Sequence, residues 1–340
     1  MKKTIRNLIF FILLIILTFS IIFKDQNISE IMSIINHVKK EYLIIAVLCM
    51  CAYILCDALN IGRTLRNLKE KSNFIKNVKY SLIGFFFSGI TPAASGGQPM
   101  QIYYMHKDNI SVGNSTLALL VNLSCMQIVT ISLALISFAF NCRFMEVQML
   151  WFFAIGIFLN ICALALILIS LLSRKATKWI IDKFVGILRF FKVKSIEEKQ
   201  KRIEDELRKY QSGARYIKHN AVLMIKTLIF TYIQYIFLYA ISYFVYRSFG
   251  LKNENILQLI SLQAVLCGTV SGIPSPGAVG VSEGGYMSIY SRVYGVEILS
   301  SAMLLTRVIN FYLFILISSI VVIVNDLKGK KQIEQQVETE

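Results

Sequence analysis

The chain has 340 residues, of which 56% are hydrophobic and only 16% are charged. A soluble domain of this length could not enclose so much apolar surface in one core, so the composition excludes a soluble globular protein and indicates an integral membrane protein. The net charge of +16 would favour a nucleic-acid partner if it lay in one soluble domain. Here the basic residues flank apolar runs, so we attribute the charge to membrane orientation and anionic lipid headgroups and predict no nucleic-acid partner.

Six apolar segments are long enough to cross a bilayer. They cover approximately residues 5–23, 42–61, 115–140, 149–172, 221–246 and 298–324. The first segment follows a basic start and lacks a small-x-small cleavage site, so we expect it to be retained as the first span. Residues 1–325 are therefore assigned to a single transmembrane domain, and residues 326–340 to a polar C-terminal tail.

Two further apolar segments, residues 80–104 and 256–292, contain all four prolines of the chain, together with many glycines. Proline and glycine interrupt helices and free backbone polar groups that nothing in hydrocarbon can satisfy. Irregular backbone at membrane depth is tolerated only where it is buried in protein or lines a polar cavity. Two such breaks in one chain therefore predict a cavity.

The charged loops decide how the two broken segments are placed. Residues 62–79 carry six lysines and arginines against one glutamate, and residues 173–220 carry 14 against six acidic residues. The positive-inside rule assigns both loops and both termini to the cytoplasm. Both loops and both termini can lie in the cytoplasm if residues 80–104 enter the membrane from the cytoplasm and return to it, while residues 256–292 enter from outside and return there. We therefore predict an all-α polytopic membrane protein with about six spans and two oppositely oriented re-entrant hairpins, arranged like an inverted repeat.

The basic cytoplasmic loop has two parts. Residues 178–194 are apolar and basic, and are read either as an amphipathic helix on the membrane surface or as a solvated connector. A charged helix is predicted from Ser195 to Tyr210, because Ser195 and Glu198 match a capping box.

Ionisable side chains inside apolar segments are costly and mark functional sites. Glu283 lies in the second broken segment, and Arg307 lies about one third into the last span, with Asn310 one turn further on the same face. A carboxylate and a guanidinium in one membrane interior can pair with each other, or they can bind a lipid headgroup. Both can hold, since a switchable pair can exchange partners with a zwitterionic or charged ligand.

Gln98 and Gln101 follow the first break. If a short helix begins near Gly97, both glutamines lie close to its N-terminus, where free N–H groups favour anions such as phosphate. Small residues at both breaks let the backbone approach a ligand or let helices pack tightly. These residues are Ser95, Gly96 and Gly97 in the first break and Ser275, Gly277 and Gly280 in the second. Asn122 and Gln234 are expected to form hydrogen bonds between helices.

Signatures of soluble enzymes are missing from the sequence. It contains no Walker loop, dinucleotide-binding fingerprint or H-E-x-x-H motif, and its seven cysteines show no metal-binding spacing. We therefore predict no cofactor, no metal and no catalytic residue.

At its two breaks the chain resembles the lysylphosphatidylglycerol synthase transmembrane-region family, the flippase-like membrane domain of the multiple peptide resistance factor and its stand-alone relatives. The resemblance covers nearly the whole chain. It is carried by Thr91-Pro92-Ala-Ala-Ser-Gly96-Gly97-Gln98-Pro99 with Gln101, by Pro274-Ser-Pro276-Gly277-Ala-Val-Gly280-Val-Ser-Glu283-Gly284, and by Thr306-Arg307. Many family members have Glu and Arg where this chain has Gln98 and Gln101, which leaves the identity of the substrate open.

The resemblance implies a protein of the bacterial cytoplasmic membrane that translocates a polar lipid, in the best known members an aminoacylated phosphatidylglycerol. Such lipids reduce the negative surface charge and repel cationic peptides. Its partners would be membrane phospholipids, and a homodimer is left open. The family's full-length synthases also carry a cytosolic acyltransferase-like domain, whereas this chain ends shortly after its last span, so we expect that domain to be absent.

The leading hypothesis is thus a lipid flippase-like transporter with a substrate site formed by both breaks. The candidate residues are Pro92, Ser95, Gly96, Gly97, Gln98, Gln101, Pro274, Ser275, Pro276, Gly277, Gly280, Glu283, Arg307 and Asn310. One alternative is an enzyme, or the membrane subunit of an enzyme, that transfers an aminoacyl or glycosyl group to a lipid, with Glu283 as its intramembrane candidate base. The other is a scaffold that anchors a partner through residues 173–220.

Overall fold

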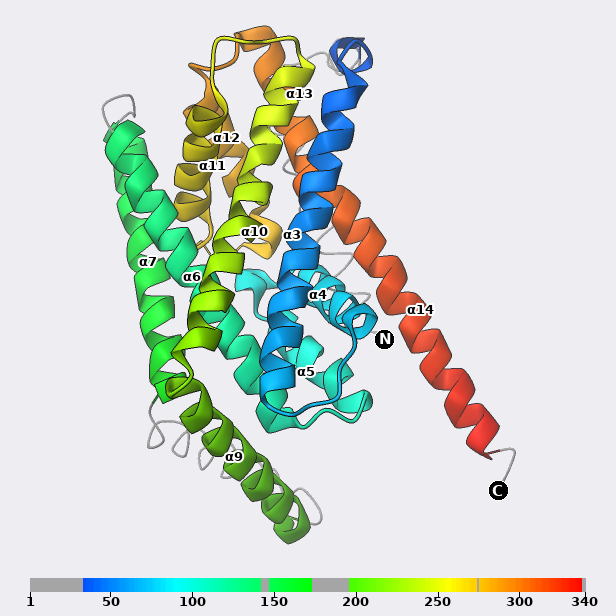
Figure 1. Cartoon of the computed structure of the whole chain (residues 1–340). Coiled ribbons are helices and arrows are strands. Elements are labelled where there is room, and N and C mark those ends of the chain that lie inside the picture. The colour runs from blue at the N-terminus through cyan, green and yellow to red at the C-terminus, as the bar shows by residue number, and fades with distance from the viewer. Residues whose placement is uncertain (1–32, 142–146, 173–195, 274, 338–340) are drawn as a thin grey trace.

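The computed structural model describes residues 33–141, 147–172, 196–273 and 275–337, and every regular element in these ranges is a helix (Figure 1). Within these ranges, five helical stretches are long and apolar enough to cross a membrane. The prediction of an all-α polytopic membrane protein is therefore confirmed.

The five stretches correspond to five of the six predicted spans. They are α3 (Lys40–Asn67), α6 (Val112–Asn141), α7 (Val147–Leu172), α10 (Ala221–Ser248), and α13 (Val296–Arg307), which continues through the π-helical segment η4 (Val308–Tyr312) into α14 (Leu313–Val337). The predicted first span, residues 5–23, lies outside the described residues. Several of these helices run beyond the apolar segments, because a polar end can continue a helix without lying in hydrocarbon. Helix α14 in particular extends into the polar tail.

Both broken segments are helical hairpins. The first consists of α4 (Phe74–Gly89), the short 3₁₀ turn η1 (Pro92–Ala94) and α5 (Gly97–Lys107). The second consists of α11 (Ile256–Val270), the 3₁₀ turn η3 (Pro276–Ala278) and α12 (Val281–Tyr290). The hairpins lie toward opposite ends of the bundle and their tips contact each other in its middle, so the predicted opposite orientation is present (Figure 1).

The two tips adopt nearly the same backbone conformation. Each has an extended residue, a proline at the start of the 3₁₀ turn, and then two residues in the left-handed region. The left-handed residues are Ala93 (φ 52°), Ala94 (φ 53°), Gly277 (φ 59°) and Ala278 (φ 53°). Alanine rarely adopts this conformation, and such residues persist where the surrounding structure fixes them, often at functional sites. The inverted-repeat character is thus visible in the backbone of the tips.

The spans pack around the hairpins. Helix α10 packs along α3, α6 contacts both α7 and α11, and α14 contacts α4 (Figure 1). Helix α7 exposes large apolar side chains, among them Trp151 and Phe158. An apolar outer surface of this kind suits contact with lipid tails.

Within the loop that the sequence predicts to be cytoplasmic, the structure describes helix α9 (Ile196–Lys218). Its predicted end at Tyr210 is wrong, because the helix continues to Lys218. The predicted capping residue Ser195 and the segment 178–194 lie outside the described residues. The helix is tied to the spans, since Glu206 Oε2 accepts a 2.7 Å hydrogen bond from the Gly113 amide at the start of α6.

Candidate functional site

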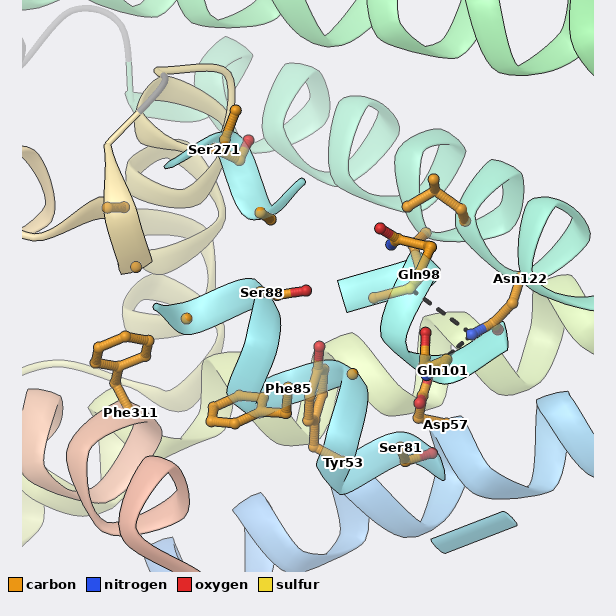
Figure 2. Close-up of a pocket in the computed structure, with 18 of the residues that line it drawn as sticks. Tyr53, Asp57, Ser81, Phe85, Ser88, Gln98, Gln101, Asn122, Ser271 and Phe311 are labelled. Carbon is orange, nitrogen blue, oxygen red and sulfur yellow. Dashed lines mark hydrogen bonds between the residues drawn. The ribbon is translucent and has the colours of Figure 1, made fainter. Parts of the chain in front are cut away.

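A cavity of about 350 Å³ lies between the two hairpin tips, with walls contributed by α3, α4, α5, α6 and both 3₁₀ turns (Figure 2). Its polar lining includes Asp57, Gln98, Gln101, Asn122, Ser271 and Ser275. The rest of the wall is largely apolar and includes Tyr53 and Phe311. The predicted cavity therefore exists, and both Pro/Gly breaks contribute to it.

Asp57 is a cavity residue that the sequence interpretation missed. It lies in the middle of α3, inside the predicted span 42–61, and the apolar residues around it hide this single carboxylate in a hydropathy average. Asn122 Nδ2 on α6 donates a 2.7 Å hydrogen bond to Asp57 Oδ1 (Figure 2). Ser81 on α4 lines the same cavity, but its buried hydroxyl has no hydrogen-bond partner among the described residues, and neither has the buried amide of Gln234 on α10. The rule that singles out Glu283, namely that an ionisable residue inside an apolar segment marks a functional site, also identifies Asp57 when it is applied to every span.

The two glutamines lie where α5 begins. The helix starts at Gly97, as predicted, and Gln98 in its first turn lines the cavity. Gln101 also lines it, but Gln101 is buried and its Nε2 donates a 3.0 Å hydrogen bond to the Tyr80 carbonyl of α4. Gly84 makes this possible, because a Cβ at that position would collide with the Gln101 amide. Gln101 therefore joins the two helices of the hairpin and contributes to the wall.

Glu283 and Arg307 form a buried ion pair. Glu283 is fully buried, Arg307 is 7% exposed, and Arg307 Nε lies 2.7 Å from Glu283 Oε1. The carboxylate also accepts a 2.7 Å hydrogen bond from the Gly280 amide and a 3.1 Å hydrogen bond from the Tyr312 hydroxyl. Glu283 thus caps the start of α12 and is satisfied on both of its oxygens. Pairing, one of the two alternatives that the sequence left open for these residues, is therefore present, and binding of a headgroup stays a prediction.

The ion pair also holds the second hairpin tip. Arg307 Nη2 donates a 3.1 Å hydrogen bond to the carbonyl of Gly277, the left-handed residue that lines the cavity. The guanidinium lies over the Phe311 ring, 4.5 Å from its centroid. Immediately after Arg307 the chain becomes π-helical, an irregularity that is frequent at functional sites. Asn310 belongs to this segment, and its buried Oδ1 has no hydrogen-bond partner.

The structure thus separates the candidate residues into three groups. Gln98, Gln101, Ser275 and Gly277 line the cavity. Glu283 and Arg307 lie behind the second tip as a pair. The cavity lining does not include Pro92, Ser95, Gly96, Gly97, Pro276, Gly280 or Asn310. Pro274 lies outside the described residues.

The first tip is organised by its own side chains. Thr91 Oγ1 donates to the Phe87 carbonyl at 2.5 Å and accepts a 2.9 Å hydrogen bond from the Gly96 amide. Gly97 packs against α4 so closely that a Cβ would lie 3.0 Å from the Gly84 carbonyl oxygen and would collide with Ser88. Glycine is required there by the close approach of two backbones.

The lining residues can hydrogen-bond a polar group that enters the bundle. Amides such as Asn122 and the glutamines offer both donors and acceptors, and Asp57 offers a carboxylate. Water or a lipid headgroup could satisfy them in a bundle whose outer surface is apolar.

Comparison with known proteins agrees with this architecture. The family model of the lysylphosphatidylglycerol synthase TM region matches residues 6–318. A UPF0104 membrane protein from Archaeoglobus fulgidus is 24% identical over 335 residues, which cover 94% of this chain and 97% of the relative.

Proposed function

Because the chain belongs to the lysylphosphatidylglycerol synthase transmembrane-region family, we propose that it is a lipid flippase-like transporter. Its substrate would be a polar or aminoacylated phospholipid resembling lysyl-phosphatidylglycerol. The membrane would be the bacterial cytoplasmic membrane, with both termini in the cytoplasm. Movement of such a lipid to the outer leaflet would reduce surface charge and so contribute to resistance against cationic peptides.

The observation that carries the proposal is the polar cavity between the hairpin tips. Transporters bind substrates near the bilayer midplane, where discontinuous helices of two repeats meet. The volume of about 350 Å³ lies at the lower end of ligand pockets, which suits a headgroup whose acyl chains stay in the surrounding lipid.

The cavity, together with the ion pair behind its second tip, offers a partner to each half of a headgroup. The N-terminus of α5, with Gln98 in its first turn, would bind phosphate through free backbone N–H groups. If the ion pair opens, Glu283 would bind a cationic group of the lipid headgroup and Arg307 would bind a phosphate oxygen. In the conformation described here the pair is closed, so substrate entry would have to compensate for its separation.

The test is reconstitution of the purified protein into liposomes that contain fluorescent or aminoacylated phosphatidylglycerol, with transbilayer movement as the readout. Glu283→Gln and Arg307→Ala should abolish movement, and because both variants break a buried ion pair, each rate is measured only on protein that circular dichroism shows to be folded in the membrane. Glu297→Gln is the matched control, because this carboxylate is exposed at the start of α13.

Three results would contradict parts of the proposal. Wild-type rates in both ion-pair variants would reject the roles of Glu283 and Arg307. No movement of any lipid by folded wild-type protein would reject transport. A new lipid made from phosphatidylglycerol and aminoacyl-tRNA would favour a membrane enzyme instead.

A further inference from the structure

The carboxylates of Asp57 and Glu283 both lie inside the helical bundle, but they differ in their partners. Glu283 is neutralised by Arg307 at 2.7 Å. Asp57 lines the cavity together with the neutral side chains of Ser81 and Asn122, and Asn122 donates a hydrogen bond to it. The described cavity lining contains no lysine, arginine or histidine.

Among the described residues, the helices packed around Asp57 bring no cation to it. On its own helix Tyr53 also lines the cavity and Cys56 precedes it in the chain, while Tyr235 of α10 packs against the Tyr53 ring; none of these side chains carries a positive charge. Helices α4 and α6 contribute the neutral Ser81 and Asn122. The next arginine along α3, Arg63, is directed to the Asn60 amide oxygen and the Phe230 ring. Arg307, which precedes η4, forms an ion pair with Glu283.

A carboxylate without a countercharge in a membrane interior is stable only as the neutral acid or with a bound cation. The neighbouring amide suits both forms of the acid. Asn122 Nδ2 donates to Asp57 Oδ1, and Asn122 Oδ1 is buried with no hydrogen-bond partner. The amide can therefore donate to the carboxylate and has a spare acceptor for the proton of the carboxylic acid.

We propose that Asp57 is the proton-binding residue of the cavity and couples lipid movement to the transmembrane proton gradient. This role rests on the proposed transport function. When the cavity is open to one side, the carboxylate takes one proton from water and becomes a neutral carboxylic acid. When the cavity is open to the other side, the same O–H bond breaks and the proton leaves to water there. One proton crosses in each cycle, and the step requires no electron transfer and no further reactant.

The first experiment imposes a pH difference across liposomes that contain the wild-type protein, and compares the rate of lipid movement with that at equal pH. The wild-type rate should change several-fold with the gradient, and Asp57→Asn should remove this dependence. Asp57→Glu should preserve it, because it retains a titratable carboxyl at the site. Glu297→Gln, an exposed carboxylate outside the cavity, should respond like wild type.

The outcomes separate the coupling from the transport function. Wild-type protein that moves lipid without responding to the gradient overturns the coupling and leaves the flippase proposal intact. A gradient response that persists in Asp57→Asn also overturns it. If Asp57→Asn loses only cationic lipids and the wild type shows no gradient response, Asp57 binds a headgroup amine and not a proton.

A second experiment needs no transport. Infrared spectroscopy of the purified protein in lipid should show a carboxylic-acid C=O band at neutral pH that is absent in Asp57→Asn and present in Glu297→Gln. A spectrum in which Asp57 is ionised throughout the neutral range would overturn proton binding even if wild-type protein moved no lipid.

Discussion

Removal of the Glu283 carboxylate should destabilise the protein severely, because Arg307 would be left as a buried charge without a partner. We expect Glu283→Ala to lower the free energy of unfolding by about 3–5 kcal/mol, the cost of removing one partner of a buried pair. The local geometry supports this range. The carboxylate is fully buried and accepts hydrogen bonds from Arg307 Nε, the Gly280 amide and the Tyr312 hydroxyl.

Replacing both partners should cost less than replacing Glu283 alone. The double variant Glu283→Leu, Arg307→Met leaves no buried charge, and apolar replacement of a whole ion pair is often neutral or stabilising. Some destabilisation should remain, because the Gly280 amide loses its acceptor and the Gly277 carbonyl loses the donor Arg307 Nη2.

Equilibrium unfolding in mixed micelles, followed by far-UV circular dichroism, measures the double-mutant cycle of Glu283→Leu, Arg307→Met and their combination, with Glu283→Ala measured alongside. A coupling free energy of roughly 2 kcal/mol or more between the two positions is expected for residues in direct contact. Additive effects, or a loss below about 1 kcal/mol in Glu283→Ala, would refute the view that the pair stabilises the second tip.

Two further predictions concern the first hairpin and helix α9. Gly97→Ala should separate α4 from α5 and lower the melting temperature. Gly284→Ala should have a melting temperature equal to or above that of the wild type, because a Cβ at this helical position meets no atom within 4 Å. Equal melting temperatures of the two variants would contradict the packing argument. Burial raises the pKa of Glu206, but hydrogen bonds from Lys209 and the Gly113 amide outweigh it and hold that pKa below its usual value. The carboxylate therefore contributes stability that is present above its unfolded-state pKa of about 4.3 and is lost as pH falls through the folded-state pKa. The protection of the α9 amides against hydrogen exchange, relative to the intrinsic exchange rate at the same pH, should fall at that acidic pH, and in Glu206→Gln already at neutral pH. Unchanged protection in the variant would show that Glu206 does not hold the helix.

The sequence predicts the spans well, because hydropathy over about 20 residues is decided locally. It also predicts the hairpins, since prolines and glycines at membrane depth need an enclosed environment, and the balance of basic loops requires opposite orientations. The start of α5 at Gly97 follows from the same pattern. Helix ends are less predictable, as α9 shows by continuing to Lys218.

Features set by tertiary contact could not be predicted. The π-helical segment after Arg307 has no local signature. The hydrogen bond from Gln101 to the Tyr80 carbonyl depends on how closely α4 and α5 approach. The proximity of Asp57 to the cavity depends on the packing of α3 against α4 and α6. The presence of Asp57 inside a span and the role of Asn122 in hydrogen bonds between helices were both visible in the sequence, but the pairing of these two residues was not.

Because the two carboxylates have different surroundings, their replacement should change different properties of the protein. Glu283 is joined by Arg307 and the Gly280 amide to the backbone of the second tip, so its replacement should act first on stability. Asp57 faces the cavity among neutral groups, and Asp57→Asn preserves the shape of the side chain and removes only the titratable proton site. A variant that remains as stable as wild type but loses its response to a pH gradient therefore reports on chemistry in the cavity. A variant that loses stability and transport together reports on the architecture that forms it.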